Sequence, residues 1–223
     1  MSRKVITTKD NSKTLLITSN DDTYHSIHGA LTESNHVFIN AGLKTIRPTS
    51  KVKIFEMGFG TGLNCILTLQ HGTKHNLNIE YHSVEKFPIT SDEIEALDYE
   101  SLLKPELQPY FKIIHDINWG ALEKINNQFS LCKINDDMMH SELNDNFFDL
   151  IYFDAFGPKS QPELWKPIIL SKMYHGLKPG GLFITYCAQG QFKRDLKSVG
   201  FEVRNLPGPP GKREITQGIK PLI

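Results

Sequence analysis

The chain has 223 residues, with 25 Lys and Arg balanced by 25 Asp and Glu, so its formal net charge at pH 7 is zero. This length fits one domain and is sufficient to bury a complete hydrophobic core. Zero net charge excludes overall basicity as an argument for a nucleic-acid partner. The last 34 residues nevertheless carry seven basic residues against three acidic ones, a weak indication of an anionic partner.

The cysteines and the hydropathy pattern bear on cellular context. Cys65, Cys132 and Cys187 form no C-x-x-C pair, which is typical of core thiols in a reducing compartment. The sequence opens without a signal-peptide pattern, and no apolar run approaches the roughly 18 residues that a membrane span requires. We therefore expect a cytoplasmic protein with no membrane segment.

The first 35 residues differ in character from the rest. Two alternating apolar runs within residues 3–19 flank the turn-forming sequence KDNS at 9–12, which predicts a β-hairpin. Residues 21–34 are polar and aromatic and contain too few aliphatic side chains to form a core. We expect residues 1–35 to form a hairpin and an extension covering the functional site, and residues 36–223 to form the main domain.

A strand, a glycine-rich turn and a helix follow one another from residue 52. Residues 52–55 read as a buried strand, Glu56 ends it, and Gly58, Gly60 and Gly62 precede an amphipathic helix. In a doubly wound α/β fold this turn lies at the carboxyl edge of the sheet, where ligands bind. The G-x-G-x-G spacing matches neither the dinucleotide nor the phosphate-loop fingerprint. Glu56 would repel a pyrophosphate but could hold an ammonium group; the alternative is a tight turn without a ligand.

Alternating strands and helices continue to the end of the chain. We predict strands at 77–84, 129–134, 147–153, 181–187, 201–206 and 213–216, mostly helical structure at 88–127, helices at 168–177 and 192–198, and a turn at 178–181. Such alternation over about 170 residues predicts an α/β fold with a mainly parallel, Rossmann-like sheet and right-handed crossovers.

Acidic residues follow three of these strands directly. Glu85, next to Lys86, ends the second strand, where one carboxylate can accept hydrogen bonds from both hydroxyls of a ribose. Asp136 and Asp137 follow the third strand, and Asp154 follows the fourth, which is apolar on both faces. We expect these side chains to meet at one edge of the sheet.

With these segments placed, the chain resembles the methyltransferase family that completes 5-methylaminomethyl-2-thiouridine at the wobble position of tRNA. That family occurs as a stand-alone protein and as the N-terminal half of a bifunctional enzyme. The resemblance covers nearly the whole chain. It rests on the sequences DTYHS at 22–26, EMGFGTGLN at 56–64, VEKFP at 84–88, DAFGP at 154–158, PELW at 162–165 and GKRE at 211–214.

The resemblance implies a class I S-adenosylmethionine methyltransferase fold and S-adenosyl-L-methionine as cofactor. The family usually carries Gly-Asp after strand three, where this chain has Asn135-Asp136, so either Asp136 or Asp137 contacts the adenine side. The residues expected to bind the cofactor lie after the first four strands: Glu56, Gly58, Gly60, Thr61, Gly62, Asn64, Glu85, Lys86, Asp136 and Asp154.

Methyl transfer to an aminomethyl group requires an aligned, neutral nitrogen lone pair, and Asp154 is the expected catalytic residue. Its carboxylate could orient the amine or take its proton. A base outside a duplex also needs a flat surface on which to stack. Tyr24, Phe156 and Trp165 are the available rings, although Phe156 and Trp165 could equally be core residues, and Asp154 could be a turn or helix-capping carboxylate.

Other candidate residues concern the substrate. His28, with His25, could line the substrate mouth, and surface histidines are the alternative. His71 and His75 have i, i+4 spacing but lack the glutamate of a zinc motif, so we expect no metal. Four basic residues near the C-terminus are candidates for phosphate contacts, which position a nucleic acid without reading its sequence: Lys193, Arg194, Lys212 and Arg213.

Three functions remain open at this point. The first is methylation of the 5-aminomethyl group of wobble uridine in tRNA, with tRNA as partner. Because nothing in these residues resembles the oxidase half of the bifunctional enzyme, another enzyme would then supply the aminomethyl substrate. The second is a small-molecule amine N-methyltransferase, which zero net charge favours. The third is an RNA-binding α/β module whose glycine turn holds no cofactor.

Overall fold

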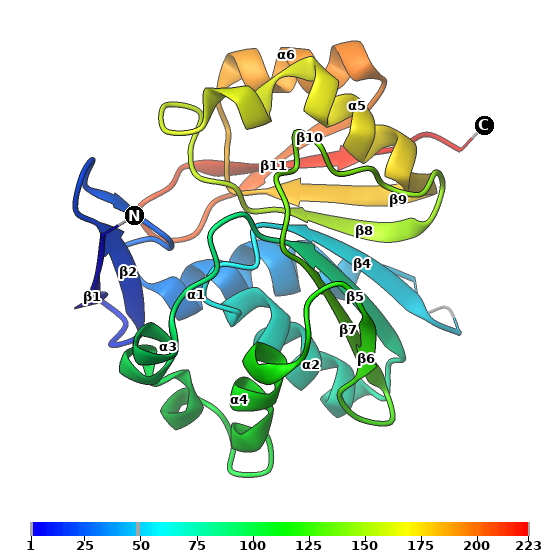
Figure 1. The fold of residues 1–223 in the computed structure, drawn as a ribbon. Helices are drawn as coiled ribbons and strands as arrows, with labels where there is room; N and C mark the ends of the chain where they lie inside the picture. Colours follow the sequence, from blue (N-terminus) through cyan, green and yellow to red (C-terminus); the bar gives the residue numbers. More distant parts are fainter. Residues whose placement is uncertain (1, 48–49, 223) are drawn as a thin grey trace.

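The computed structural model describes residues 2–47 and 50–222 (Figure 1). The elements follow in the order β1 (Arg3–Thr7), β2 (Lys13–Ile17), β3 (Asp22–Thr23), α1 (Ala30–Ser34), the π-helix η1 (Asn35–Asn40), the 3-10 helix η2 (Leu43–Thr45), β4 (Val52–Met57), α2 (Leu63–His75), β5 (Ile79–Val84), α3 (Ser91–Leu97), the 3-10 helix η3 (Tyr99–Leu102), α4 (Gln108–Asp116), β6 (Leu122–Lys124), β7 (Phe129–Ile134), β8 (Phe148–Phe153), the 3-10 helix η4 (Pro162–Trp165), α5 (Pro167–Gly176), β9 (Leu177–Thr185), α6 (Gly190–Val199), β10 (Glu202–Pro207) and β11 (Glu214–Ile219).

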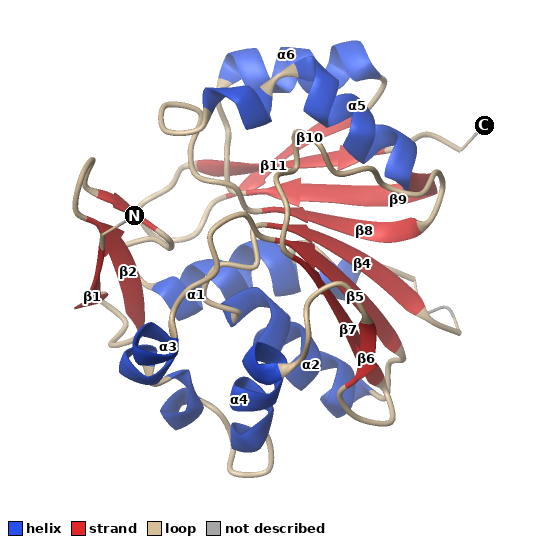
Figure 2. Cartoon of the chain, viewed as in Figure 1, coloured by secondary structure: helices blue, strands red, loops and turns tan. Residues whose placement is uncertain are grey.

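The central sheet of the described residues has eight strands in the order β10-β11-β9-β8-β4-β5-β7-β6. The strands from β9 to β7 run parallel to one another, whereas β10 and β11 at one edge and β6 at the other pair antiparallel. The prediction of a mainly parallel α/β sheet is thus confirmed. Figure 2 shows helices on both faces, with α5 and α6 on one face and α2 and α4 on the other.

The central strands are apolar on both sides because each face packs against helices. Along β8, Tyr152 packs into the core cluster that includes α2 and α4, while Phe153 packs into the cluster that includes α5 and α6. Ile54 and Phe55 of β4 divide in the same way between the two clusters. This alternation explains why these strands read as continuous apolar runs, as expected for parallel strands covered on both faces.

The N-terminal residues form a separate three-stranded sheet. β1 and β2 pair antiparallel, which confirms the predicted hairpin, and the short β3 adds a strand that was not predicted. In Figure 1 this blue sheet lies beside α3, at the side of the central sheet where β4, β5 and β8 end. The N-terminal segment thereby reaches the carboxyl edge of the central sheet.

Two predictions of local structure were wrong. The sequence at 178–181 is not a turn between elements but lies inside β9, where the pairing with β8 shifts from Phe148↔Leu177 to Leu150↔Leu182. A bulge of this kind absorbs the extra residues, so the strand continues past them. Residues 117–127 are not helical, because β6 folds back and pairs antiparallel with β7.

Cys65, Cys132 and Cys187 are buried and unpaired, as predicted for core thiols. Within residues 2–47 and 50–222, no helix combines the length and apolar character required to cross a lipid bilayer.

Candidate active site

A cavity of about 530 Å³ opens at the carboxyl ends of the parallel strands, where ligands bind in open α/β sheets. The volume lies in the range of ordinary small-molecule and cofactor sites. Its walls come from segments that are distant in sequence: residues 21–27 of the N-terminal segment, 57–60 after β4, 84–87 after β5, 136–138 after β7, 154–157 after β8, and Lys212 between β10 and β11.

The glycine turn forms one wall of this cavity with its backbone. Gly58 and Gly60 have φ of 90° and 51°, in the left-handed region that side-chain-bearing residues seldom adopt. A Cβ added at Gly58 would lie 3.1 Å from the carbonyl oxygen of Asp154, and one at Gly60 would lie 3.2 Å from the ring of Tyr24. The glycines therefore let neighbouring segments and a ligand approach the backbone.

Thr61 and Gly62 lie behind this wall and do not line the cavity. The Thr61 hydroxyl is 2.7 Å from Nε2 of His25, and Gly62 is the N-cap residue of α2. Burial lowers the pKa of His25 to about 4, so the ring is neutral near pH 7. Both residues thus help to fix the shape of the turn, and their contact with the cofactor remains a prediction.

Glu85 joins two walls of the cavity. Its Oε2 accepts a hydrogen bond of 2.9 Å from the backbone N–H of Gly60, and its Oε1 accepts one of 2.7 Å from that of Phe87. A carboxylate offers about four lone-pair sites, so acceptor capacity remains for a diol. This placement agrees with the predicted ribose contact, which remains a prediction.

Three charged residues near Glu85 form the outer rim of the cavity: Lys86, Asp136 and Asp137. The Lys86 ammonium pairs with Oδ2 of Asp137 at 2.7 Å, and Asp137 also accepts from the backbone N–H of Met139. Asp136 accepts from Ser141 Oγ at 2.8 Å. Both aspartates line the cavity, so the choice between them as the adenine-side contact stays open.

Glu56 lies beneath the cavity and has no exposed surface. Ser83 Oγ donates to its Oε2 at 2.8 Å, while Oε1 has no hydrogen-bond partner among the residues that the structure describes. Burial raises the pKa of Glu56 well above its usual range, and the charge of Asp154 adds to the effect. Glu56 does not line the cavity, and its contact with the ammonium group of the cofactor remains a prediction.

Asp154 follows β8 and lines the cavity next to the glycine turn, since an added Cβ at Gly58 would lie 3.1 Å from the Asp154 carbonyl oxygen. Its Oδ2 accepts a hydrogen bond of 2.7 Å from the Asn64 amide, at the start of α2. Burial and the Glu33 carboxylate raise the pKa of Asp154 to about 7, against the lowering effects of Asn64 and Lys212. A carboxyl group with a pKa near neutrality is suited to exchanging a proton with a bound amine.

The three candidate rings have different surroundings. Tyr24 and Phe156 both line the cavity and meet edge to face, with ring centroids 4.9 Å apart. Trp165 is only 5% exposed and packs edge to face against Phe153 and Phe192. Its Nε1 donates to the Phe156 carbonyl at 2.8 Å, so Trp165 is a core residue that supports the loop, not a stacking surface.

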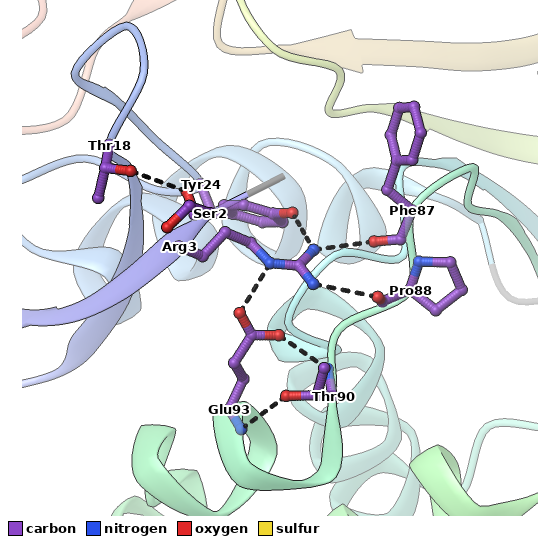
Figure 3. Close-up of polar contacts among 8 residues, drawn as sticks. All are labelled: Ser2, Arg3, Thr18, Tyr24, Phe87, Pro88, Thr90 and Glu93. Carbon is purple, nitrogen blue, oxygen red and sulfur yellow. Dashed lines mark hydrogen bonds and ion pairs between the residues drawn. The ribbon is translucent and has the colours of Figure 1, made fainter.

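Arg3 ties the N-terminal sheet to the cavity wall, which sequence reasoning missed (Figure 3). Its guanidinium donates to the Tyr24 hydroxyl at 2.9 Å, to the carbonyls of Phe87 and Pro88 at 3.0 and 3.2 Å, and to Glu93 at 2.7 Å. Only 7% of the Arg3 side chain is exposed. No local pattern marks this residue, because its partners lie more than 20 positions away in sequence.

His28 does not line the cavity; its ring packs against Gly211, where an added Cβ would lie 2.3 Å from His28 Cδ2. His25, named with His28 as a candidate for the substrate mouth, does line the cavity. Glu33 and Tyr186 also line it and were absent from the predicted binding residues. Glu33 lies in α1 and not after a strand, and Tyr186 follows β9 without the acidic residue that marked the other strand ends.

The four basic candidates separate into two groups. Lys193 pairs with Glu214 at 2.7 Å with 14% of its side chain exposed, and Lys212 pairs with Glu33 in the cavity wall. These two lysines are therefore engaged within the protein and are poor candidates for phosphate contacts. Arg194 and Arg213 are exposed, so they remain predicted phosphate contacts.

His71 and His75 are the histidine pair with i, i+4 spacing. His71 and His75 lie at the end of α2 with ring centroids 4.2 Å apart. Across the described parts of the chain, no group of three or more His, Cys, Asp or Glu side chains is arranged to hold a metal ion.

A family model described as S-adenosyl-L-methionine-dependent methyltransferase matches residues 98–221, more than half of the chain. The chain belongs to this methyltransferase family. The cavity fits its cofactor: Gly58 and Gly60 line it with backbone, and Glu85, which also lines it, retains acceptor sites for a ribose.

Curated relatives of this methyltransferase share one name, "tRNA 5-methylaminomethyl-2-thiouridine biosynthesis bifunctional protein MnmC". The protein of Pseudoalteromonas atlantica is 32% identical over 227 residues, covering 92% of this chain and 32% of the relative. That of Chromobacterium violaceum is 30% identical over 214 residues, covering 88% and 32%. The chain thus spans about a third of the length of these relatives.

Solved structures support the same fold. The crystal structure of MNMC2 from Aquifex aeolicus has a TM-score of 0.79 and 25% identity, covering 100% of this methyltransferase and 72% of that chain. Spermidine synthase from Thermotoga maritima has a TM-score of 0.60 and 15% identity, covering 99% and 70%, a likeness of fold alone.

Proposed function

We propose that this protein methylates the 5-aminomethyl group of the wobble uridine or 2-thiouridine in tRNA, giving the 5-methylaminomethyl nucleoside. The observation that carries the proposal is the placement of Asp154 in one cavity with Gly58, Gly60 and Glu85. Under this proposal, a carboxyl group able to act on an amine lies in the same cavity as the methyl donor. The shared name of the curated relatives supports tRNA as the substrate class.

The cofactor, when bound, supplies a methyl group activated on a sulfonium. We propose that Gly58, Gly60, Glu85, Lys86 and one of the two rim aspartates hold it. Asp154, kept in place by Asn64, accepts a hydrogen bond or a proton from the substrate aminomethyl group and thereby favours the neutral nitrogen. Holding that nitrogen in line with the methyl group is the main contribution of the protein.

The substrate base would enter beside the N-terminal segment. Tyr24 and Phe156 offer ring surfaces in the cavity, and the exposed Ile27 and Phe87, at 52% and 44%, extend an apolar surface outward from it. Single-stranded RNA loops are recognised largely by stacking on such side chains. We propose that residues 1–35 cover the substrate in this way.

The test is nucleoside mass spectrometry of tRNA from cells lacking this protein. Under the proposal, 5-aminomethyl-uridine or its 2-thio form accumulates, and purified protein with S-adenosyl-L-methionine converts it to the methylated nucleoside. Unchanged tRNA nucleosides, together with methylation of a free amine in vitro, would instead identify a small-molecule amine methyltransferase.

A further inference from the structure

An ion pair lies in the cavity wall beside Asp154 and has no part in the function proposed above. Glu33, from α1, is 7% exposed, and its Oε1 accepts a hydrogen bond from the ammonium group of Lys212. Both residues line the cavity. They are separated by 179 positions in sequence, so the pair connects the N-terminal segment to the loop between β10 and β11.

Both members of the pair have further contacts that fix their positions. The second carboxylate oxygen of Glu33 accepts a hydrogen bond of 2.8 Å from the backbone N–H of Ser26, which also lines the cavity. The Lys212 ammonium lies 3.9 Å from the centre of the Tyr186 ring, and the Tyr186 hydroxyl donates to the Ala155 carbonyl at 2.8 Å. The pair is thereby linked to the segment that carries Asp154.

We propose that Glu33 and Lys212 form a positioning pair in the cavity wall that sets the charge of Asp154. This inference rests on the proposed function, because it assigns the pair to the control of the group that acts on the amine. Neither residue is assigned a contact with the reacting atoms; both act through Asp154.

Several elements contribute charged or titratable groups near Asp154. Glu33 belongs to α1, Lys212 to the β10–β11 loop, Glu56 to β4, and Tyr186 follows β9, while the neutral Asn64 amide comes from α2. Glu33 raises the pKa of Asp154 and Lys212 lowers it. Removing Glu33 should therefore lower the pKa of Asp154, and removing Lys212 should raise it.

The experiment measures kcat/KM for methylation of tRNA carrying 5-aminomethyl-2-thiouridine from about pH 5.5 to about pH 9. Lys212→Gln should move the midpoint of the acid limb upward by on the order of one pH unit, and Glu33→Gln should move it downward by a similar amount. The double variant should return close to the wild-type midpoint, and Lys212→Arg should keep it. The amine of the substrate contributes equally in all variants.

A matched control is Lys178→Met, which removes another lysine ion pair. Lys178 pairs with Asp149 at 2.6 Å near the first residues of β9 and β8, away from the carboxyl ends of the strands. This variant should leave the midpoint unchanged. A loss of rate at all pH values without opposite shifts would reduce Glu33 and Lys212 to structural residues and overturn the proposal. Shifts of both variants in the same direction would also overturn it.

A second readout does not depend on the substrate. Carbon-13 NMR of aspartate carboxyl groups follows the titration of Asp154 directly, with its resonance assigned by its absence in Asp154→Asn. Opposite displacements of this titration in Lys212→Gln and Glu33→Gln support the pair even if wild-type protein does not methylate the tRNA, in which case the proposed function alone fails. Coincident titrations in the two variants and the wild type overturn the pair.

Discussion

Two parts of the cavity wall differ in what they are made of: the cofactor end, formed by the glycine turn and Glu85, and the part formed by Asp154 with the nearby Glu33 and Lys212. At the cofactor end, Gly58 and Gly60 present backbone, and Glu85 is held by two backbone N–H groups. In the other part, Asp154 accepts a hydrogen bond from the Asn64 amide, and the nearby pair of Glu33 and Lys212 acts on Asp154 through its charges. Changes of shape in the glycine turn should therefore alter cofactor binding. Changes of charge around Asp154 should alter turnover.

The largest effect is expected from a change of shape at the cofactor end. Gly60→Val places a branched side chain on a residue with φ of 51°, where even a Cβ would lie 3.2 Å from the Tyr24 ring. We expect cofactor affinity to fall by about 100-fold or more, since the strain and the blocked volume together exceed about 3 kcal/mol. Isothermal calorimetry with S-adenosyl-L-methionine and with its demethylated product measures this loss.

Gly120→Val is the matched control for that prediction. Gly120 also has a positive φ of 86°, but nothing lies within 4 Å of an added Cβ, and the residue does not line the cavity. It should pay a similar backbone cost and retain cofactor binding. Normal binding by Gly60→Val would show that the glycine turn does not hold the cofactor.

A change of charge at Asp154 should separate catalysis from binding. Asp154→Asn keeps the size of the side chain and should leave cofactor affinity nearly unchanged while turnover falls about 100-fold. Because the pKa of Asp154 is raised to about 7, wild-type activity should decline as pH falls through 7, when the carboxylate becomes protonated. That limb should disappear in the variant.

The measurements are single-turnover rates across pH and calorimetric affinity for the cofactor. Near-normal turnover in Asp154→Asn would reduce Asp154 to a turn residue. Loss of cofactor affinity in the same variant would contradict the division of tasks between the glycine turn, which binds the cofactor, and Asp154, which acts on the amine.

Arg3 offers a smaller effect, at the wall where the N-terminal sheet meets the segment that follows β5. Arg3→Met removes the hydrogen bonds to Tyr24 and to the carbonyls of Phe87 and Pro88, which belong to the cofactor-side wall and its continuation (Figure 3). Losing charge-assisted hydrogen bonds worth about 1.5–3 kcal/mol each should raise the KM for the cofactor by about 10-fold, because part of the loss is recovered by water.

Steady-state kinetics with the cofactor varied test this prediction, with kcat and the acid midpoint of the pH profile expected to stay at wild-type values. Arg3→Lys should recover part of the affinity, since it restores the charge but not the fork of donors. A fall in kcat with unchanged KM would place the action of Arg3 at Asp154 instead.

The smallest effects are expected outside the cavity, at the exposed arginines. If Arg194 and Arg213 contact phosphates, each substitution by Ala should lower the log–log salt slope of tRNA binding by roughly 0.7–0.9. Lys193→Ala should change the slope less, because its ammonium group is already paired with Glu214. Fluorescence anisotropy at several salt concentrations measures the slopes, and a slope that is flat in the wild type favours a small-molecule substrate.

Local sequence patterns were sufficient for the parts of this protein that depend on neighbouring residues. The alternation of apolar strands and helices predicted the parallel sheet, because both faces of β4 and β8 must be apolar to pack against helices. The positions of Glu85, Asp136 and Asp154 followed from the rule that parallel strands end at one edge, and all three line the cavity.

What the sequence alone could not decide is which side chains reach the cavity from a distance, and which are covered. Glu56 follows the same strand-end rule as Glu85, yet it is fully buried, and Trp165 is a core residue that supports the loop of Phe156. Arg3 meets its partners only after the N-terminal sheet packs beside the carboxyl edge. Burial and long-range ion pairs depend on how all layers pack together, so only the tertiary structure determined them.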